Sequence, residues 1–185
     1  MSFSDWIQVL AATATVLLLV AACFTDITRY RIPNAIVYAI VAAFAVYAIF
    51  NGAWPQLGWS VLAATGMFLL GAGLFALGLF GGGDVKLIAA MALWMPLSDL
   101  PHFLIVMTLA GGILGLIWLL RRRLSARPSA STAAAPSDGA LEATAAPARP
   151  NVPNRLPYGV AIALAGIDYF FLSVHSPFAP LLPWS

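Results

Sequence analysis

Long apolar runs separated by short polar segments make up most of the chain. A membrane-spanning α-helix needs about 20 mostly apolar residues to cross the hydrocarbon layer. The runs therefore predict an all-α, polytopic membrane protein with about six transmembrane helices, over residues 6–24, 34–50, 57–80, 87–96, 102–120 and 156–174. The fourth run is too short to cross alone, so it either crosses together with the glycines before it or dips partway into the bilayer.

The basic residues indicate how these helices are oriented. Cytoplasmic loops of membrane proteins are enriched in Lys and Arg. With six spans and the N-terminus outside, all nine basic residues fall on the cytoplasmic side: Arg29, Arg31, Lys86, Arg121, Arg122, Arg123, Arg127, Arg149 and Arg155. This agreement is lost if the fourth run does not cross. The same orientation places Asp26 and Asp84 at the same depth on the inner face.

Composition agrees with this topology and narrows the classes of site. Of 185 residues, 62% are hydrophobic and 9% are charged, which is typical of a membrane protein. The single cysteine excludes an intrachain disulfide, and two distant histidines argue against a zinc site. We predict no metal and no cofactor. The arginines at positions 121–123 favour contact with anionic lipid over binding of nucleic acid.

One segment differs in kind from the apolar runs. Residues 121–155 are rich in Ala, Pro and Ser and show no hydrophobic periodicity. Such a segment cannot bury enough apolar surface to offset the entropy of ordering it. We therefore predict a disordered cytoplasmic loop within a single membrane domain that covers residues 1–185.

Asp26 and Asp84 are the candidate catalytic residues. A carboxylate beside hydrocarbon is costly unless a partner, water or a function holds it there. Asp84 follows the glycines at 81–83, so it is either a helix N-cap behind a flexible hinge or a reactive group past which a substrate backbone runs closely. Asp26 is either a solvated loop acid beside two arginines or a second reactive carboxylate.

Three segments, taken in order, resemble the type IV prepilin peptidases, which are intramembrane aspartic proteases with a Gly-x-Gly-Asp signature. They are Ile32-Pro33-Asn34, Gly81-Gly82-Gly83-Asp84 and Leu156-Pro157-Tyr158-Gly159-Val160-Ala161. The resemblance implies that Asp26 and Asp84 are the catalytic pair, with Lys86 beside the signature. It also implies a bacterial inner-membrane enzyme whose active site faces the cytoplasm. Its partner would be a prepilin in the same lipid bilayer, from which it removes the basic leader.

The chain departs from longer members of that family. Those members carry an N-terminal cytoplasmic domain with paired Cys-x-x-Cys motifs and a methyltransferase activity. The chain is instead similar to the short branch associated with Flp-type (tight-adherence) pili. We therefore do not expect it to methylate its product.

The two carboxylates supply a mechanism without a metal or a nucleophile. Two neighbouring carboxylates cannot both ionise cheaply, so one retains a proton. The ionised group takes a proton from water while the other donates to the scissile carbonyl. Because the pair titrates as a unit, neither Asp is assigned as the acid or the base. The sequence leaves open whether the positive charges of Lys86, Arg29 and Arg31 or desolvation by the bilayer dominates the pKa of the pair.

Three other functions stay open at this stage. A proton-coupled small transporter subunit would also place carboxylates beside the membrane. A non-catalytic membrane factor of pilus assembly would tolerate replacement of either Asp by Asn. A Gly-x-Gly-Asp protease acting on other membrane substrates would not. The sequence specifies neither the pilin nor the oligomeric state.

Overall fold

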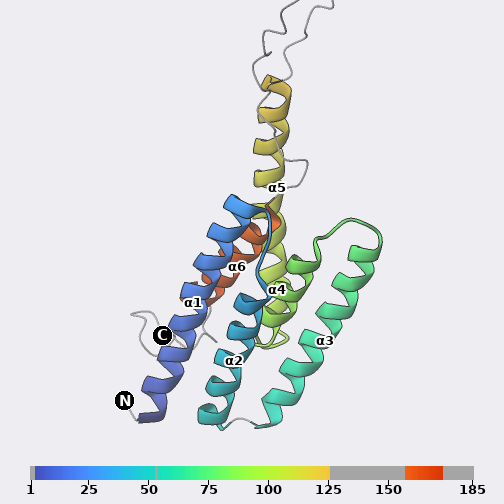
Figure 1. Ribbon diagram of the computed structural model, residues 1–185. Coiled ribbons are helices and arrows are strands. Elements are labelled where there is room, and N and C mark those ends of the chain that lie inside the picture. Colours follow the sequence, from blue (N-terminus) through green and yellow to red (C-terminus); the bar gives the residue numbers. More distant parts are fainter. Residues whose placement is uncertain (1–2, 53, 126–156, 173–185) are drawn as a thin grey trace, which may run out of the picture.

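The computed structural model describes residues 3–52, 54–125 and 157–172, which form helices joined by short turns (Figure 1). The helices are α1 (Phe3–Arg29), α2 (Asn34–Asn51), α3 (Trp54–Ala76), α4 (Gly82–Ala92), α5 (Leu100–Ser125) and α6 (Tyr158–Leu172). No strand occurs in these ranges. The all-α fold predicted from the apolar runs is confirmed.

Helix length separates clear membrane spans from shorter elements. Three segments of the described chain are long and apolar enough to cross a membrane: α1, Leu57–Ala76 of α3, and Leu100–Leu124 of α5. Two shorter apolar helices, Asn34–Phe50 within α2 and α6 itself, accompany them. With 11 residues, α4 is about 17 Å long, roughly half the thickness of the hydrocarbon layer. The chain is a membrane protein, and the full count of six spans with an outside N-terminus stays a prediction.

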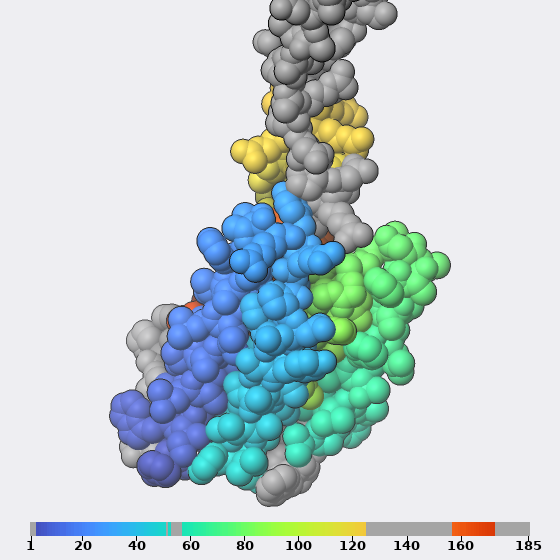
Figure 2. All heavy atoms as spheres, viewed as in Figure 1, coloured from blue at the N-terminus to red at the C-terminus, as the bar shows by residue number. Residues whose placement is uncertain are grey.

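Helices α4 and α6 lie at the centre of the bundle (Figure 1). α6 packs against α1, α5 and α4, while α2 packs against α1 and α4, and α3 packs against α4. Small residues allow this close approach: a Cβ added at Gly166 would lie 2.8 Å from Leu19 Cδ1 and 3.0 Å from Met91 Cε. In the space-filling view, atoms of α4 show between those of α2 and α3 (Figure 2). The central pair thus fixes the position of α1, from which one candidate aspartate comes.

Helix α5 extends beyond the rest of the bundle (Figure 1). Its last turn includes residues 121–125, which the sequence had assigned to the loop, so this boundary needs correction. Cationic side chains stabilise the C-terminal end of a helix, and the Arg122 guanidinium lies 5.3 Å from the centre of the Trp118 ring. The expected loop therefore starts after Ser125, and residues 126–155 lie outside the described residues.

Candidate active site

Asp26 is a buried residue of α1. The sequence placed it in a loop past the first span, but α1 continues to Arg29, and Asp26 is only 5% exposed. Its carbonyl accepts the N–H of Tyr30 at 2.9 Å, and Tyr30 then turns the chain with a φ of 50°. The reading of Asp26 as a solvated loop acid was therefore wrong. A polar side chain buried in this way needs partners.

The N-terminus of α6 provides those partners. The backbone N–H groups of Gly159 and Val160 donate to the Asp26 carboxyl group. The first N–H groups of a helix have no partner within the helix, so they suit a carboxylate. Oδ2 of Asp26 has no hydrogen-bond partner among the described residues. This oxygen therefore has an unsatisfied capacity to accept a hydrogen bond.

Asp84 lies in the first turn of α4. Gly81 is the N-cap of this helix, so the prediction that Asp84 itself is the cap was wrong by one turn. The carboxylate instead reaches back, and its Oδ2 accepts the N–H of Gly81 at 3.2 Å. An acidic residue three positions after the cap commonly satisfies the cap's own N–H in this way. This contact holds the Asp84 carboxylate at the N-terminus of α4.

The two aspartates line one hollow of about 710 Å³. Its walls come from the end of α1 and the turn after it, from the α3–α4 connection, and from the start of α6. The other lining residues are Tyr30, Arg31, Ile32, Phe75, Gly78, Leu79, Phe80, Gly81, Gly82, Gly83 and Tyr158. Residues that are 58 positions apart in the sequence are thereby brought together, as the predicted pair requires.

Burial dominates the electrostatics of Asp84, which precedes the apolar part of α4. Burial first, and the charge of Asp26 second, raise the pKa of Asp84 from 3.8 to about 6, while the bond from Gly81 opposes the shift. Burial within the protein and the like charge of Asp26 thus both favour the protonated form of Asp84. Near neutral pH this carboxyl group is poised to exchange a proton.

Lys86 does not face this pair. Its Nζ donates to Asn34 Oδ1 at 3.1 Å, which links α4 to α2. Successive residues of an α-helix are about 100° apart, so Lys86 and Asp84 lie on nearly opposite sides of α4. The expected influence of Lys86 on the carboxylates is not supported by these contacts, because its amine is engaged on the α2 side.

Ile32 connects the N-termini of α4 and α6. A Cβ added at Gly83 would lie 3.3 Å from Ile32 Cβ, and one added at Gly159 would lie 2.8 Å from Ile32 Cδ1. Pro33 follows as the N-cap of α2 with a φ of −61°, which is the value that its ring imposes. The segment therefore fixes how the turn after α1 meets both helix ends.

The three consecutive glycines have different surroundings. A Cβ at Gly81 would lie 2.7 Å from Asp84 Oδ2, whereas one at Gly82 would meet only the Phe75 ring, at 3.6 Å. A side chain at Gly81 or Gly83 would thus crowd Asp84 or Ile32 inside the protein. Only Gly82 leaves ordinary space for another molecule, so clearance for a substrate accounts for one glycine of the three.

The sequence did not predict the contact between the Phe80 and Tyr158 rings or the role of Gly159. The rings of Phe80 and Tyr158 meet edge to face, 5.0 Å apart, and the Tyr158 ring lies directly against Gly111. A Cβ at Gly159 would come within 2.8 Å of Asp26 Oδ2. The Tyr-Gly pair before the last apolar run was noted only as part of a resemblance, because its contacts depend on how α6 packs against α1.

Asp168 lies away from the hollow. Its Oδ2 lies 2.9 Å from Nε2 of His102, and position 168 is near the opposite end of α6 from Tyr158. His175 lies outside the described residues. Among the residues that the structure describes, no group of three or more His, Cys, Asp or Glu side chains is placed to hold a metal ion. The hollow itself is lined by the two carboxylates together with Tyr30, Arg31 and Tyr158.

Comparison with known proteins identifies the family of the chain. The prepilin leader peptidase/N-methyltransferase of Legionella pneumophila is 29% identical to the chain over 124 residues, which cover 63% of this chain and 43% of that relative. The chain thus matches less than half the length of that relative. No solved structure matches the chain. The sequence profile of the type IV leader peptidase family matches residues 13–116, which is more than half of the chain, and the chain therefore belongs to that family.

Proposed function

We propose that the protein is an aspartic prepilin leader peptidase of the bacterial inner membrane. It removes the basic leader of a type IV, Flp-like prepilin at the cytoplasmic face. The convergence of Asp26 and Asp84, from α1 and α4, on one hollow carries this proposal. Membership of the leader peptidase family gives the class of substrate that fits such a pair in a membrane.

The proposed chemistry uses one proton shared by the pair. The ionised carboxylate accepts a proton from a water molecule, and the resulting hydroxide attacks the scissile carbonyl while the other carboxyl group protonates its oxygen. In the collapse of the tetrahedral intermediate, the carboxyl group that took the proton from water gives it to the leaving amine, while the other carboxylate takes a proton from the diol. The C–N bond then breaks and releases the leader and the new N-terminus of the pilin. The unpartnered Oδ2 of Asp26 and the pKa of about 6 at Asp84 both suit this exchange. Neither residue is assigned as the acid or the base.

The charges around the hollow support a cytoplasmic position. Arg31 lines the hollow, and Arg29 ends α1 one turn after Asp26. The positive-inside rule places such residues at the inner face. A prepilin with a basic leader before an apolar helix would have its scissile bond at about this depth.

Leader cleavage tests the proposal directly. The chain is co-expressed with a C-terminally tagged Flp-type prepilin, and the mass shift is followed for wild type, Asp26→Asn and Asp84→Asn. We expect cleavage by wild type and a loss of roughly four orders of magnitude in either variant, as for other catalytic side chains that act as a unit. Asp168→Asn, which changes a carboxylate at the other end of the bundle, is the matched control and retains cleavage.

Membrane insertion of each variant is checked so that a folding defect is not read as lost chemistry. Normal processing by either Asn variant would remove the dyad and favour a non-catalytic assembly factor. Failure of well-inserted wild type to cleave several prepilins would contradict the proposed substrate class.

A further inference from the structure

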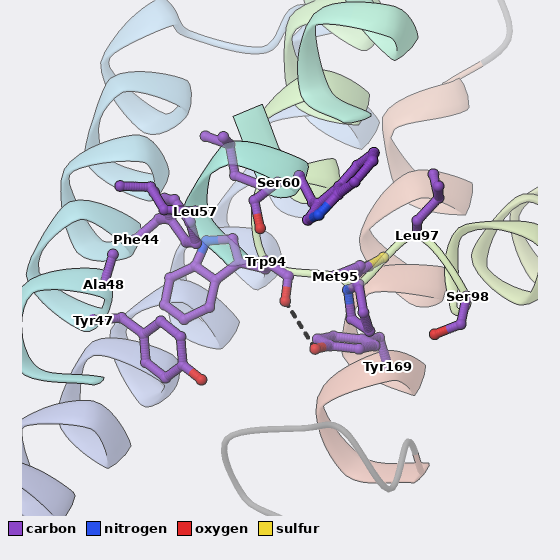
Figure 3. Close-up of a pocket in the computed structure, with 13 residues that line it drawn as sticks. Phe44, Tyr47, Ala48, Leu57, Ser60, Trp94, Met95, Leu97, Ser98 and Tyr169 are labelled. Carbon is purple, nitrogen blue, oxygen red and sulfur yellow. Dashed lines mark hydrogen bonds between the residues drawn. The ribbon is translucent and has the colours of Figure 1, made fainter. Parts of the chain in front are cut away.

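A second hollow lies beyond the C-terminal end of α4, and Figure 3 shows the residues that line it. It has a volume of about 430 Å³ and is lined by α2, α3, α6 and the segment that follows α4. We call it the aromatic cavity, because Phe44, Tyr47, Trp59, Trp94 and Tyr169 contribute rings to its wall. The Trp94 ring centre lies 5.2 Å from that of Tyr47 and 5.6 Å from that of Phe44. The cavity shares no lining residue with the hollow that contains the aspartates.

The indole N–H of Trp94, a residue that lines this cavity, is an unsatisfied hydrogen-bond donor within the described part of the chain. The Trp94 side chain is 5% exposed, and its indole Nε1 has no hydrogen-bond partner among the described residues. Its backbone carbonyl, by contrast, accepts the Tyr169 hydroxyl at 2.8 Å (Figure 3). A buried N–H without an acceptor is costly. The cavity therefore fits an apolar group that brings one carbonyl or hydroxyl oxygen.

A stripe of half-buried positions along α4 connects the two hollows. The half-buried positions of α4 and its C-cap are Gly82, Gly83, Asp84, Lys86, Ala89 and Leu93. The stripe consists of Gly82, Lys86, Ala89 and Leu93. Their spacing of four, three and four residues places them on one helical face. Gly82 lines the hollow with the aspartates, and Leu93 lines the aromatic cavity.

Helices α3 and α2 border this stripe on its two sides. Phe75 of α3 lies nearest the Cβ position of Gly82, and Asn34 of α2 accepts the hydrogen bond of Lys86. Atoms of α4 show between these helices on the surface (Figure 2). We call this strip the α4 groove. It offers no unpaired charge, because its single cation is engaged by Asn34.

We propose that the α4 groove binds the apolar helix of the substrate downstream of the scissile bond, and that the aromatic cavity is its distal subsite. The inference rests on the proposed function. From Gly82 to Leu93 the helix that forms the base of the groove advances by 11 residues, or about 17 Å. A helical substrate with the same rise therefore places the residue about 11 positions after the scissile bond at the cavity. There its oxygen accepts the Trp94 N–H.

Two substrates with the same leader and scissile bond separate this groove from the chemistry. One is a full-length prepilin, and the other ends five residues after the scissile bond, so it cannot reach the cavity. Ala89→Trp fills the middle of the groove, and Ala42→Trp places the same bulk on an exposed position of α2. We expect Ala89→Trp to lower kcat/KM on the full-length substrate by about tenfold or more and to leave the short one unchanged.

The outcomes distinguish the groove from the proposed function and from disturbance of the fold. Wild type that cleaves neither substrate contradicts the proposed function itself. Ala89→Trp that cleaves both normally, or loses both equally, overturns the groove. Ala42→Trp is expected to cleave both normally, and a loss with this variant equal to that of Ala89→Trp would also overturn the proposal.

Trp94→Phe tests the distal subsite because it keeps a ring and removes the N–H. We expect KM for the full-length substrate to rise about fivefold, as for one lost hydrogen bond, with kcat unchanged. A photo-crosslinker at position 11 after the scissile bond should label Trp94 or Tyr47 when Asp84→Asn holds the substrate uncleaved. Native mass spectrometry that finds a phospholipid displaced by Ala89→Trp, without loss of full-length cleavage, would identify a lipid groove and refute the proposal.

Discussion

The two ends of α4 differ in chemistry: carboxylates gather at its N-terminus and aromatic rings beyond its C-terminus. At its N-terminus, backbone N–H groups and small glycines accompany two carboxylates, and Gly81 N–H donates to Asp84. Beyond its C-terminus, aromatic rings predominate, and a backbone carbonyl accepts the hydroxyl of Tyr169. A helix offers free donors at its start and free acceptors at its end. The acidic site therefore belongs at the first end, and side chains with donors belong at the second.

α6 runs beside α4 and repeats this polarity. Its N-terminal N–H groups hold Asp26, and its far end carries Tyr169. The paired helices thus concentrate donors at one end of the bundle. The difference between the two ends teaches that the hollow with the aspartates depends on backbone geometry, whereas the aromatic cavity depends on side-chain packing.

Among the predictions that follow, the largest effect on cleavage is expected from replacing Gly159, whose backbone lies against the Asp26 carboxylate. Gly159→Ala adds a Cβ 2.8 Å from Asp26 Oδ2 and 2.8 Å from Ile32 Cδ1, so Asp26 must move. A shift of about 1 Å at a reacting group lowers rate by on the order of 100-fold. Leader cleavage measures kcat/KM, while insertion and thermal stability should change little.

Gly112→Ala is the matched control, because a Cβ there meets nothing within 4 Å. If Gly159→Ala cleaves as well as this control, the position of Asp26 does not depend on the N-terminus of α6. The contrast between the two ends of α4 and α6 would then be unrelated to catalysis.

A smaller effect is expected from pH. The pKa of Asp84 is raised to about 6, so this carboxyl group is protonated below that pH and loses its proton above it. Catalysis that needs one proton on the pair should fall about tenfold per pH unit on the alkaline side of pH 6. The pH dependence of kcat/KM on the short substrate, which does not reach the aromatic cavity, measures this limb. A flat profile up to pH 8 would contradict the shared proton.

The smallest effect is expected on replacing Lys86 in that same experiment. Lys86→Gln removes the charge and keeps a donor for Asn34. Lys86 faces away from Asp84. The pH at which kcat/KM begins to fall should therefore change far less than the roughly one to three units caused by an opposite charge beside a carboxyl group. The short substrate is again the readout. A shift of a full unit toward higher pH would show that the Lys86 charge reaches the pair after all.

The identity of the candidate catalytic residues could be predicted from local sequence. Asp26 and Asp84 stand beside apolar runs where a charge is expensive, so their presence was informative without a structure. Their immediate contacts were not predictable. Whether Asp26 lies in a loop or a helix depends on where α1 ends, and helix ends are weakly encoded because one more turn changes the free energy little.

What the sequence by itself determined is the class of the protein: apolar runs of membrane length, basic residues that suit one face, and two carboxylates at the ends of two runs. These follow from the cost of exposing polar groups to hydrocarbon, which acts on each segment independently. Only the tertiary structure decided that Gly159 and Val160 hold Asp26, that Lys86 turns to α2, and that a half-buried stripe of α4 joins the two hollows. Such contacts depend on which faces of separate helices meet, and packing between distant segments is not contained in the pattern of any one of them.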